Sequence, residues 1–288
     1  MKIVVKPTTK CLDEYINAGA NAFIFAIEKL SSNKSINFSI NEIRKIKNNY
    51  PNITIYALVD KNIFNREIET LEKALLEIDK INIEGIIFYD LAVYEIVKEK
   101  NINTPLILNK NYLVNNYKTC NYYYDKGITS IILPSEITKE EILEIRKNTK
   151  AELFINIFGY QVMAFSERKL ITNYFKYIDE KNSKNNNYIL KEGNKYHIIE
   201  NKEATIIMSP YILNGIKYLN EFKNIDYIIL DEIDLPHTKF IKVIKTFNEV
   251  INNKISVDTG SDRISKLFTT SLGFFDTKTI YKVKKWKR

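Results

Sequence analysis

The segment that spans residues 152–175 reads Glu152-Leu-Phe-Ile-Asn-Ile-Phe-Gly-Tyr-Gln-Val-Met-Ala-Phe-Ser-Glu-Arg-Lys-Leu-Ile-Thr-Asn-Tyr-Phe175. Its first part is an apolar run, which predicts a strand that ends at Gly159. A dense polar run follows and contains Gln161, Ser166, Glu167, Arg168, Lys169, Thr172, Asn173 and Tyr174. An apolar run that turns polar directly after a glycine is typical of a buried strand that opens onto a functional loop.

Seven further apolar runs flank this strand along the chain, and helical patterns separate them. Strands are expected at residues 2–6, 22–27, 53–59, 85–88, 105–108, 130–133, 152–157 and 227–230. Two intervening helices open with capping boxes, Ser39 with Glu42 and Thr138 with Glu141. Short apolar strands that alternate with helices indicate a parallel sheet that is buried on both faces. Eight such units in a chain of 288 residues predict an α/β fold, a TIM-like (β/α)8 barrel over residues 1–252.

Two segments fall outside the repeating units. Residues 176–201 are rich in Asn, Lys and Glu and predict a flexible insertion between strands seven and eight. After it, Ser209 as a cap and Pro210 as the first helical residue predict the start of the seventh helix. Residues 253–288 follow the last barrel helix, and we expect them to form a short basic and aromatic C-terminal appendage on the rim.

Composition limits the classes of function. The net formal charge is +8 and the pI is about 9.1, which favours anionic partners and nucleic acid first, although abundant Lys and Asn also follow from an AT-rich genome. In the tail, Lys284 and Lys285 adjoin Trp286, and such a mixture can stack bases while it neutralises phosphates; a solvated tail is the alternative. No run of about 18 apolar residues is present, and the N-terminus reads as a strand rather than a signal peptide. We therefore expect no membrane span and a cytoplasmic location.

Cysteine and histidine are scarce. Cys11 and Cys120 fit a reducing compartment and are too few for a disulfide framework or a cysteine-only metal site. His197 and His237 are too few for a histidine-rich centre, and their spacing suggests no Cys–His pair. Cys120 lies in a helical run, where packing is the expected role. We expect no bound metal, and residues for proteolysis are not apparent.

In a barrel of this kind the site lies where the strands end at the C-terminal face. The polar residues at those positions are Lys6, Glu28, Asp60, Asn62, Asp90, Asn109, Asn111, Glu136 and Asp231. Simpler interpretations exist for single members, because Asp90 can cap a helix, loop carboxylates can be solvated, and asparagines favour turns. A ring of such residues nevertheless indicates a site. We predict catalytic groups at four positions: Glu28, Asn62, Asn109 and Glu136.

The polar run after the seventh strand is predicted to bind substrate or RNA. The candidates are Gln161, Ser166, Arg168, Lys169, Asn173 and Tyr174, together with Lys284 and Lys285 of the tail. Arg168 presents a planar fork that suits a carboxylate or phosphate. The alternative is a surface arginine that pairs with Glu167 or Glu152.

The same segment resembles the signature region of the collagenase-like peptidase family U-32. In the family this region usually reads His-Gly, then a short run with one or two Cys, then Ser-x-Arg and Asn-Tyr. Ser166 and Arg168 match the first of these later motifs, and Asn173 and Tyr174 match the second. Further matches fall at residues 18–23, 59–68, 90–93, 117–122, 133–137 and 270–275. The resemblance therefore covers nearly the whole chain.

The departures from the family pattern concern its chemistry. Phe158 stands where the family has His, and Val162 and Lys169 stand where members with an iron–sulfur cluster have Cys. Near strand eight, Ile229 takes the place of a family Lys. The resemblance thus implies a member that binds no iron–sulfur cluster, similar in type to short, cysteine-poor members found beside a longer paralogue.

What the resemblance implies is RNA chemistry. Better-studied members support prephenate-dependent 5-hydroxylation of wobble uridine in tRNA or of a cytidine in 23S rRNA. Partners would be tRNA or rRNA and a longer cysteine-containing paralogue, with prephenate as a co-substrate. Arg168 and Lys169 would hold an anionic group, either the prephenate carboxylate or a phosphate. The base or the small molecule would be oriented by Asn62, Asn109, Glu136 and Gln161.

Three functions remain open from the sequence. The leading one is an RNA-modification protein of the hydroxylation type. The second is a non-catalytic RNA-binding or partner subunit of a cluster-bearing paralogue, and the third is a collagenase-like peptidase.

Overall fold

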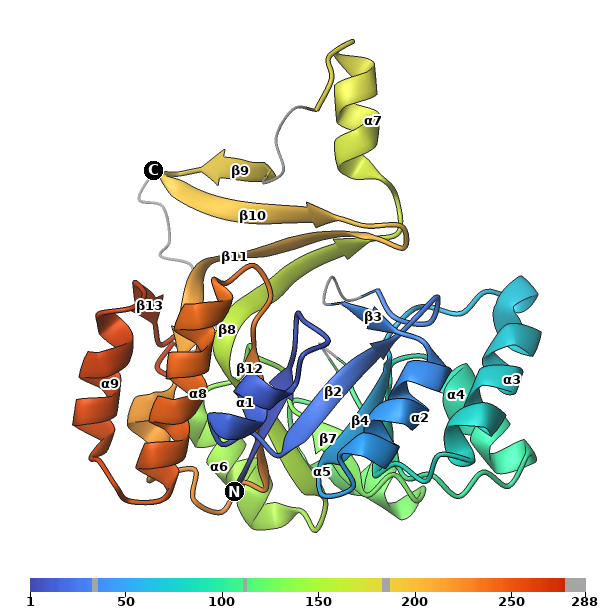
Figure 1. Ribbon diagram of the computed structural model, residues 1–288, viewed down its shortest axis with the longest axis horizontal. Coiled ribbons are helices and arrows are strands. Elements are labelled where there is room, and N and C mark those ends of the chain that lie inside the picture. The colour runs from blue at the N-terminus through green and yellow to red at the C-terminus, as the bar shows by residue number, and fades with distance from the viewer. Residues whose placement is uncertain (33–35, 111–112, 183–186, 278–288) are drawn as a thin grey trace, which may run out of the picture.

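The computed structural model describes residues 1–32, 36–110, 113–182 and 187–277. Eight parallel strands form its centre: β1 (Lys2–Lys6), β2 (Ala22–Ile27), β4 (Thr54–Val59), β5 (Gly85–Phe88), β6 (Leu106–Leu108), β7 (Ser130–Ile132), β8 (Glu152–Ser166) and β12 (Tyr227–Asp231). They form a closed ring because β12 pairs with both β1 and β8 (Figure 1). The closed parallel barrel confirms the predicted TIM-like fold.

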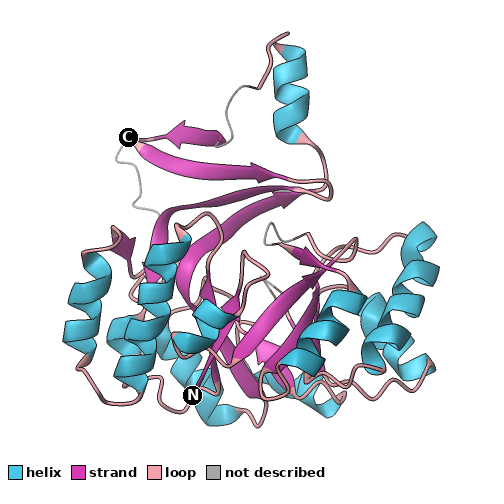
Figure 2. Cartoon of the chain, in the orientation of Figure 1, coloured by secondary structure: helices cyan, strands magenta, loops and turns pink. Residues whose placement is uncertain are grey.

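Helices cover the outside of the ring, as the cyan ribbons around the magenta strands of Figure 2 show. They are α1 (Asp13–Asn17), α2 (Ile40–Asn49), α3 (Ile68–Asp79), α4 (Leu91–Glu99), α5 (Tyr117–Asp125), α6 (Lys139–Asn148) and α8 (His237–Ile251). Both predicted capping boxes are present, at the starts of α2 and α6. Asp90 caps α4 by accepting a hydrogen bond from the Ala92 amide at 2.9 Å. Within the described ranges, no helix has the length and apolar character needed to span a membrane.

Side chains of each barrel strand alternate between two cores. In β2, Phe23 and Phe25 belong to the outer core between strands and helices, whereas Ala22 and Ile24 fill the inside of the barrel. This alternation follows from the two-residue period of a strand. It also explains why the strands read as continuous apolar runs in the sequence, since both faces are buried.

β8 does not end at Gly159 as predicted. It is 15 residues long and continues to Ser166, and beyond the barrel it pairs antiparallel with β11 (Thr205–Asn214). Gly159 has a φ of +120°, and a Cβ at this position would lie 2.5 Å from the Asp231 carbonyl oxygen. The glycine therefore lets β8 pass close to β12 where the strand leaves the barrel. The polar residues that suggested a loop belong to a ribbon outside the barrel, where strand faces need not be apolar.

The segment between β8 and β12 contains regular structure. α7 (Leu170–Tyr177) follows β8, and the predicted flexible insertion at 176–201 contains β9 (Asn187–Lys191) and β10 (Asn194–Glu200). Together with β11 and the outer half of β8 they form an arm above the barrel mouth (Figure 1). We call residues 160–214 the extension.

The predicted helix start at Ser209 and Pro210 is wrong, because both residues lie inside β11. Pro210 has no backbone donor, and the pairing of β11 with β8 is irregular between Met208 and Ile212, where a proline can be accommodated. The Ser209 hydroxyl instead donates to the Tyr211 carbonyl at 2.6 Å. A serine–proline pair that suits a helix start thus marks a strand irregularity here.

The described residues after α8, 253–277, pack on the barrel beside that helix. α9 (Val257–Ser265) contacts α8 and the short η2 helix (Ile216–Tyr218). β13 (Thr270–Ser271) pairs with β11, and the buried Phe275 ring contacts Phe222. Lys284 and Lys285 lie outside the described residues.

Candidate functional site

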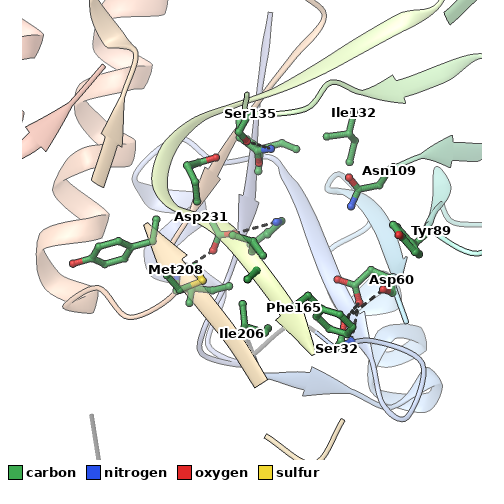
Figure 3. Close-up of a pocket in the computed structure, with 18 of the residues that line it drawn as sticks. Ser32, Asp60, Tyr89, Asn109, Ile132, Ser135, Phe165, Ile206, Met208 and Asp231 are labelled. Carbon is green, nitrogen blue, oxygen red and sulfur yellow. Dashed lines mark hydrogen bonds and ion pairs between the residues drawn. The ribbon is translucent and has the colours of Figure 1, made fainter. Parts of the chain in front are cut away.

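A cavity of about 490 Å³ lies at the C-terminal ends of the barrel strands, between the barrel mouth and the extension (Figure 3). The barrel contributes mainly polar residues: Lys6, Ser32, Asp60, Asn62, Tyr89, Asn109, Ser135, Glu136, Asn156 and Asp231. The extension contributes mainly apolar and aromatic ones: Tyr160, Gln161, Val162, Ala164, Phe165, Ile199, Ile206 and Met208. The cavity is therefore polar toward the barrel and apolar toward the extension.

Four of the residues predicted to be catalytic or substrate-binding meet in this cavity, besides Lys6, Asp60 and Asp231 of the strand-end ring. Asn62, Asn109, Glu136 and Gln161 all line it, although they come from four different strand ends. Two of them already have partners: Asn62 Nδ2 donates to Glu167 at 2.8 Å, and Gln161 Nε2 donates to the Gly159 carbonyl at 3.0 Å. These two amides are fixed in place by the fold, and their catalytic and binding roles remain predictions.

The other described candidates lie away from the cavity. Glu28 is exposed and is not part of the lining. Ser166, Arg168, Lys169, Asn173 and Tyr174 also lie outside the lining, at the far end of β8 and on α7. Arg168 follows Gly159 by nine residues, and an extended strand rises roughly 3.3 Å per residue. β8 thus leads away from Gly159 across the barrel mouth, where Glu167, next to Arg168, accepts a hydrogen bond from Asn62 Nδ2 at 2.8 Å, and Arg168 itself does not line the cavity.

Two carboxylates of the cavity are held by neighbouring groups. Lys6 Nζ lies 3.0 Å from Asp231 Oδ2, and Asp231 Oδ1 accepts from the Ile233 amide at 3.0 Å. Asp60 Oδ1 accepts from the Ser31 hydroxyl at 2.7 Å and the Ser32 amide at 2.8 Å. Asp60 therefore fixes the loop after β2, a role that differs from the solvated carboxylate considered from the sequence.

Three polar side chains on the barrel side of the lining remain without a hydrogen-bond partner among the described residues. Glu136, Asn109 and Tyr89 make no side-chain hydrogen bond to other residues of the described ranges. They follow β7, β6 and β5, which are neighbours in the barrel. Figure 3 shows Asn109 and Tyr89 on one side of the cavity and Met208 on the other. A ligand in the cavity would find its free polar partners along this one wall.

Sequence reasoning missed the aromatic and apolar part of the site. Tyr160 and Phe165 lie on β8 beyond Gly159, in the stretch taken for a loop, and Met208 lies on β11, in the stretch taken for a helix start. Burial, with a smaller effect of the Asp234 charge, raises the pKa of Tyr160. One sequence signal could have predicted β11: the mostly apolar run 204–208 is typical of a strand. It was passed over because Ser209 and Pro210 were interpreted as a helix start.

Residues 7–278 match the family described as Peptidase family U32. The chain belongs to peptidase family U32. It is 28% identical over 264 residues to "tRNA hydroxylation protein P2" of Bacillus subtilis (strain 168), covering 87% of this chain and 85% of that protein. It is 26% identical to "tRNA hydroxylation protein P1" of the same organism, over 55% of this chain and 38% of that protein. For "tRNA hydroxylation protein P" of Escherichia coli (strain K12) the identity is 25%, over 61% of this chain and 37% of that protein.

The positions where this U32 chain departs from the family signature have distinct locations. Phe158 is fully buried and packs against Phe240 and Phe247 on the helix side of the barrel. Val162 lines the cavity, and Lys169 is exposed at the start of α7. Neither Val162 nor Lys169 can ligate iron through sulfur, so the residues present do not fit a cysteine-bound cluster.

The two cysteines do not offer a protease nucleophile in the cavity. Cys120 is buried on α5, and burial raises the pKa of its thiol to about 12. A thiolate at this position is therefore strongly disfavoured near neutral pH. Cys11 is exposed and does not line the cavity.

Proposed function

We propose that this protein takes part in hydroxylation of tRNA. The observation that carries the proposal is the similarity to tRNA hydroxylation protein P2 over 87% of this chain and 85% of that protein. A wobble uridine, modified at its 5-position, is the target we favour, and a pyrimidine of rRNA is the alternative. The open cavity at the barrel mouth is where we place the base.

The chemistry of the cavity supports a base as its occupant. Proteins that modify a base take it out of the helical stack and read its edge through hydrogen bonds. Asn109 and Glu136 are free to make such bonds from the barrel wall, and Asn62 and Gln161 are held beside them. Phe165 is 41% exposed in the same cavity and offers a face on which a base can stack.

The outer end of the extension is where we place the RNA backbone. Arg168 and Lys169 are exposed there, and Asn173 and Tyr174 are exposed on α7; Ser166 Oγ accepts a hydrogen bond from the Arg168 amide at 3.2 Å. Cations next to an exposed aromatic ring suit a nucleic-acid strand. The predicted contacts of Lys284 and Lys285 remain part of this proposal.

A second candidate is a partner subunit without chemistry of its own. It is favoured by Phe158, Val162 and Lys169, which take the places of the family His and cluster cysteines. In this version the protein presents RNA to a longer, cysteine-containing paralogue, and prephenate acts as co-substrate there. The peptidase alternative is weakened by the buried Cys120 thiol and its raised pKa.

Nucleoside mass spectrometry of tRNA and rRNA from a deletion strain tests the proposal. We expect one 5-hydroxypyrimidine, or a product derived from it, to disappear from tRNA and to return with the wild-type gene. Asn109→Ala should fail to restore it, whereas Glu140→Gln, an exposed position on α6 outside the cavity, should restore it. Unchanged nucleosides in the deletion strain would reject a role in RNA hydroxylation.

A further inference from the structure

The cavity has an unbalanced set of charges. Its lining contains one cation, Lys6, and three carboxylates, Asp60, Glu136 and Asp231. Lys6 is engaged by Asp231 at 3.0 Å, and each of these two side chains is largely shielded from solvent, at 17% and 10% exposed. No cation of the lining is therefore left over for an anionic ligand.

Among the charged groups, Glu136 and the Oδ2 oxygen of Asp60 are left for a ligand to meet, as far as the described residues go. Asp60 Oδ1 is occupied by Ser31 and Ser32, and Asp231 by Lys6 and the Ile233 amide. A carboxylate only accepts hydrogen bonds. An incoming group beside Glu136 must therefore donate, and a second anion at that distance would be repelled.

The opposite side of the cavity selects for shape. Phe165, Ile206 and Met208 present apolar surface from the extension (Figure 3). A flat ring can lie against this surface while its edge faces Asn109 and Glu136. The two sides of the cavity together suit an uncharged planar ligand that carries at least one N–H on its edge.

We infer that this cavity takes an uncharged nucleobase, whose edge N–H donates to Glu136, and that it excludes dicarboxylic acids such as prephenate. The inference rests on the proposed function and adds the charge selectivity of its site. Uracil provides the N–H at N3 between two carbonyl oxygens, and the Asn109 amide can donate to one of them. A carboxylic co-substrate would then have to be bound outside this cavity or by a partner.

The methionines supply the measurement. The chain has three, Met1, Met163 and Met208, and among the lining residues only Met208 is a methionine. Protein labelled with ¹³C at the methionine methyls therefore reports on the cavity through Met208, with the Met1 signal as an internal reference. We expect uridine to shift the Met208 methyl signal in a saturable manner, and prephenate at equal concentration to leave it unmoved.

Two substitutions of Glu136 sharpen the test. Glu136→Gln should weaken uridine binding by about tenfold, because hydrogen bonds to charged groups are among the stronger ones, and Glu140→Gln should leave it unchanged. Glu136→Lys should lose uridine binding and gain a response to prephenate. Unshifted Met1 signals in each variant would show that the fold is kept.

Two outcomes would overturn the inference. One is a saturable Met208 shift with prephenate in the wild type, and the other is uridine binding that Glu136→Gln does not weaken. Either result can occur while the deletion strain still lacks its hydroxylated nucleoside, in which case the charge selectivity alone is wrong. If the deletion strain retains all its nucleosides, the proposed function itself has failed.

Discussion

Replacing Gly159 by Ala should destabilise the protein where β8 leaves the barrel. The backbone φ of +120° is one that side-chain-bearing residues rarely adopt, which costs roughly 1–3 kcal/mol. The added methyl would also lie 2.5 Å from the carbonyl oxygen and 3.0 Å from the Cβ of Asp231. Both atoms belong to Asp231 at the end of β12 and cannot rotate away, so β8 and β12 must move apart. Over-packing of this kind costs roughly 1–3 kcal/mol.

The two contributions add to a loss of about 2–6 kcal/mol, a large part of the roughly 5–15 kcal/mol by which domains are stable. Gly127→Ala is the matched control, since Gly127 has a φ of +88° but nothing lies within 4 Å of an added Cβ. Equilibrium unfolding in urea gives the free energy of unfolding of both variants. Equal losses for the two variants would refute the idea that β8 and β12 are in obligatory contact at Gly159.

Three further predictions concern local chemistry. Phe158→Ala should lower the free energy of unfolding by about 3–5 kcal/mol, because the ring is fully buried; a loss below about 1 kcal/mol would mean that the ring is not part of the core. Ellman's reagent should modify Cys11 in the native protein and spare Cys120, so two reactive thiols without denaturant would contradict the burial of Cys120. The hydrogen bond from Lys10, followed by one from the cap backbone, lowers the pKa of Glu42 from 4.5 to about 2. The stabilisation by Glu42 is thus complete above the unfolded-state pKa and is lost as pH falls toward 2, and urea midpoints should show wild type and Glu42→Gln converging as pH falls from 4.5 toward 2.

The barrel could be predicted because its signals are local. Each strand is short, apolar on both faces and separated from the next by a helix, and capping boxes such as Ser39 with Glu42 fix where helices begin. The strand-end rule then placed Asn109 and Glu136 in the cavity, since parallel strands of a barrel all end on one face. It failed for Glu28, because the strand β3 (Asn37–Phe38) pairs with the end of β2 and the Glu28 amide bonds to Phe38, leaving the side chain exposed.

The extension could not be predicted because its signals are not local. Strands β9 and β10 are rich in polar residues, and they are ordered by pairing with each other and with β11. The polar run after Gly159 reads equally well as a loop or as an exposed ribbon, and the choice depends on a partner strand about 40 residues further on. The same holds for Ser209 and Pro210, which are consistent with a helix start until β8 is placed opposite them.

The extension matters to function because it supplies a wall of the cavity and is attached to the barrel mouth. Lys61 Nζ, in a mostly buried side chain, contacts Glu203 at 2.8 Å and Glu67 at 2.7 Å. Burial opposes the charge of Lys61, but the two carboxylates outweigh it and raise the lysine pKa. Asn62, next to Lys61, bonds to Glu167, which directly follows β8. A ligand seated in the cavity therefore touches both the barrel and the extension, and these contacts fix the two parts relative to each other. The position of the far end of the extension, and of any RNA bound there, is thus set relative to the strand ends that carry Asn109 and Glu136.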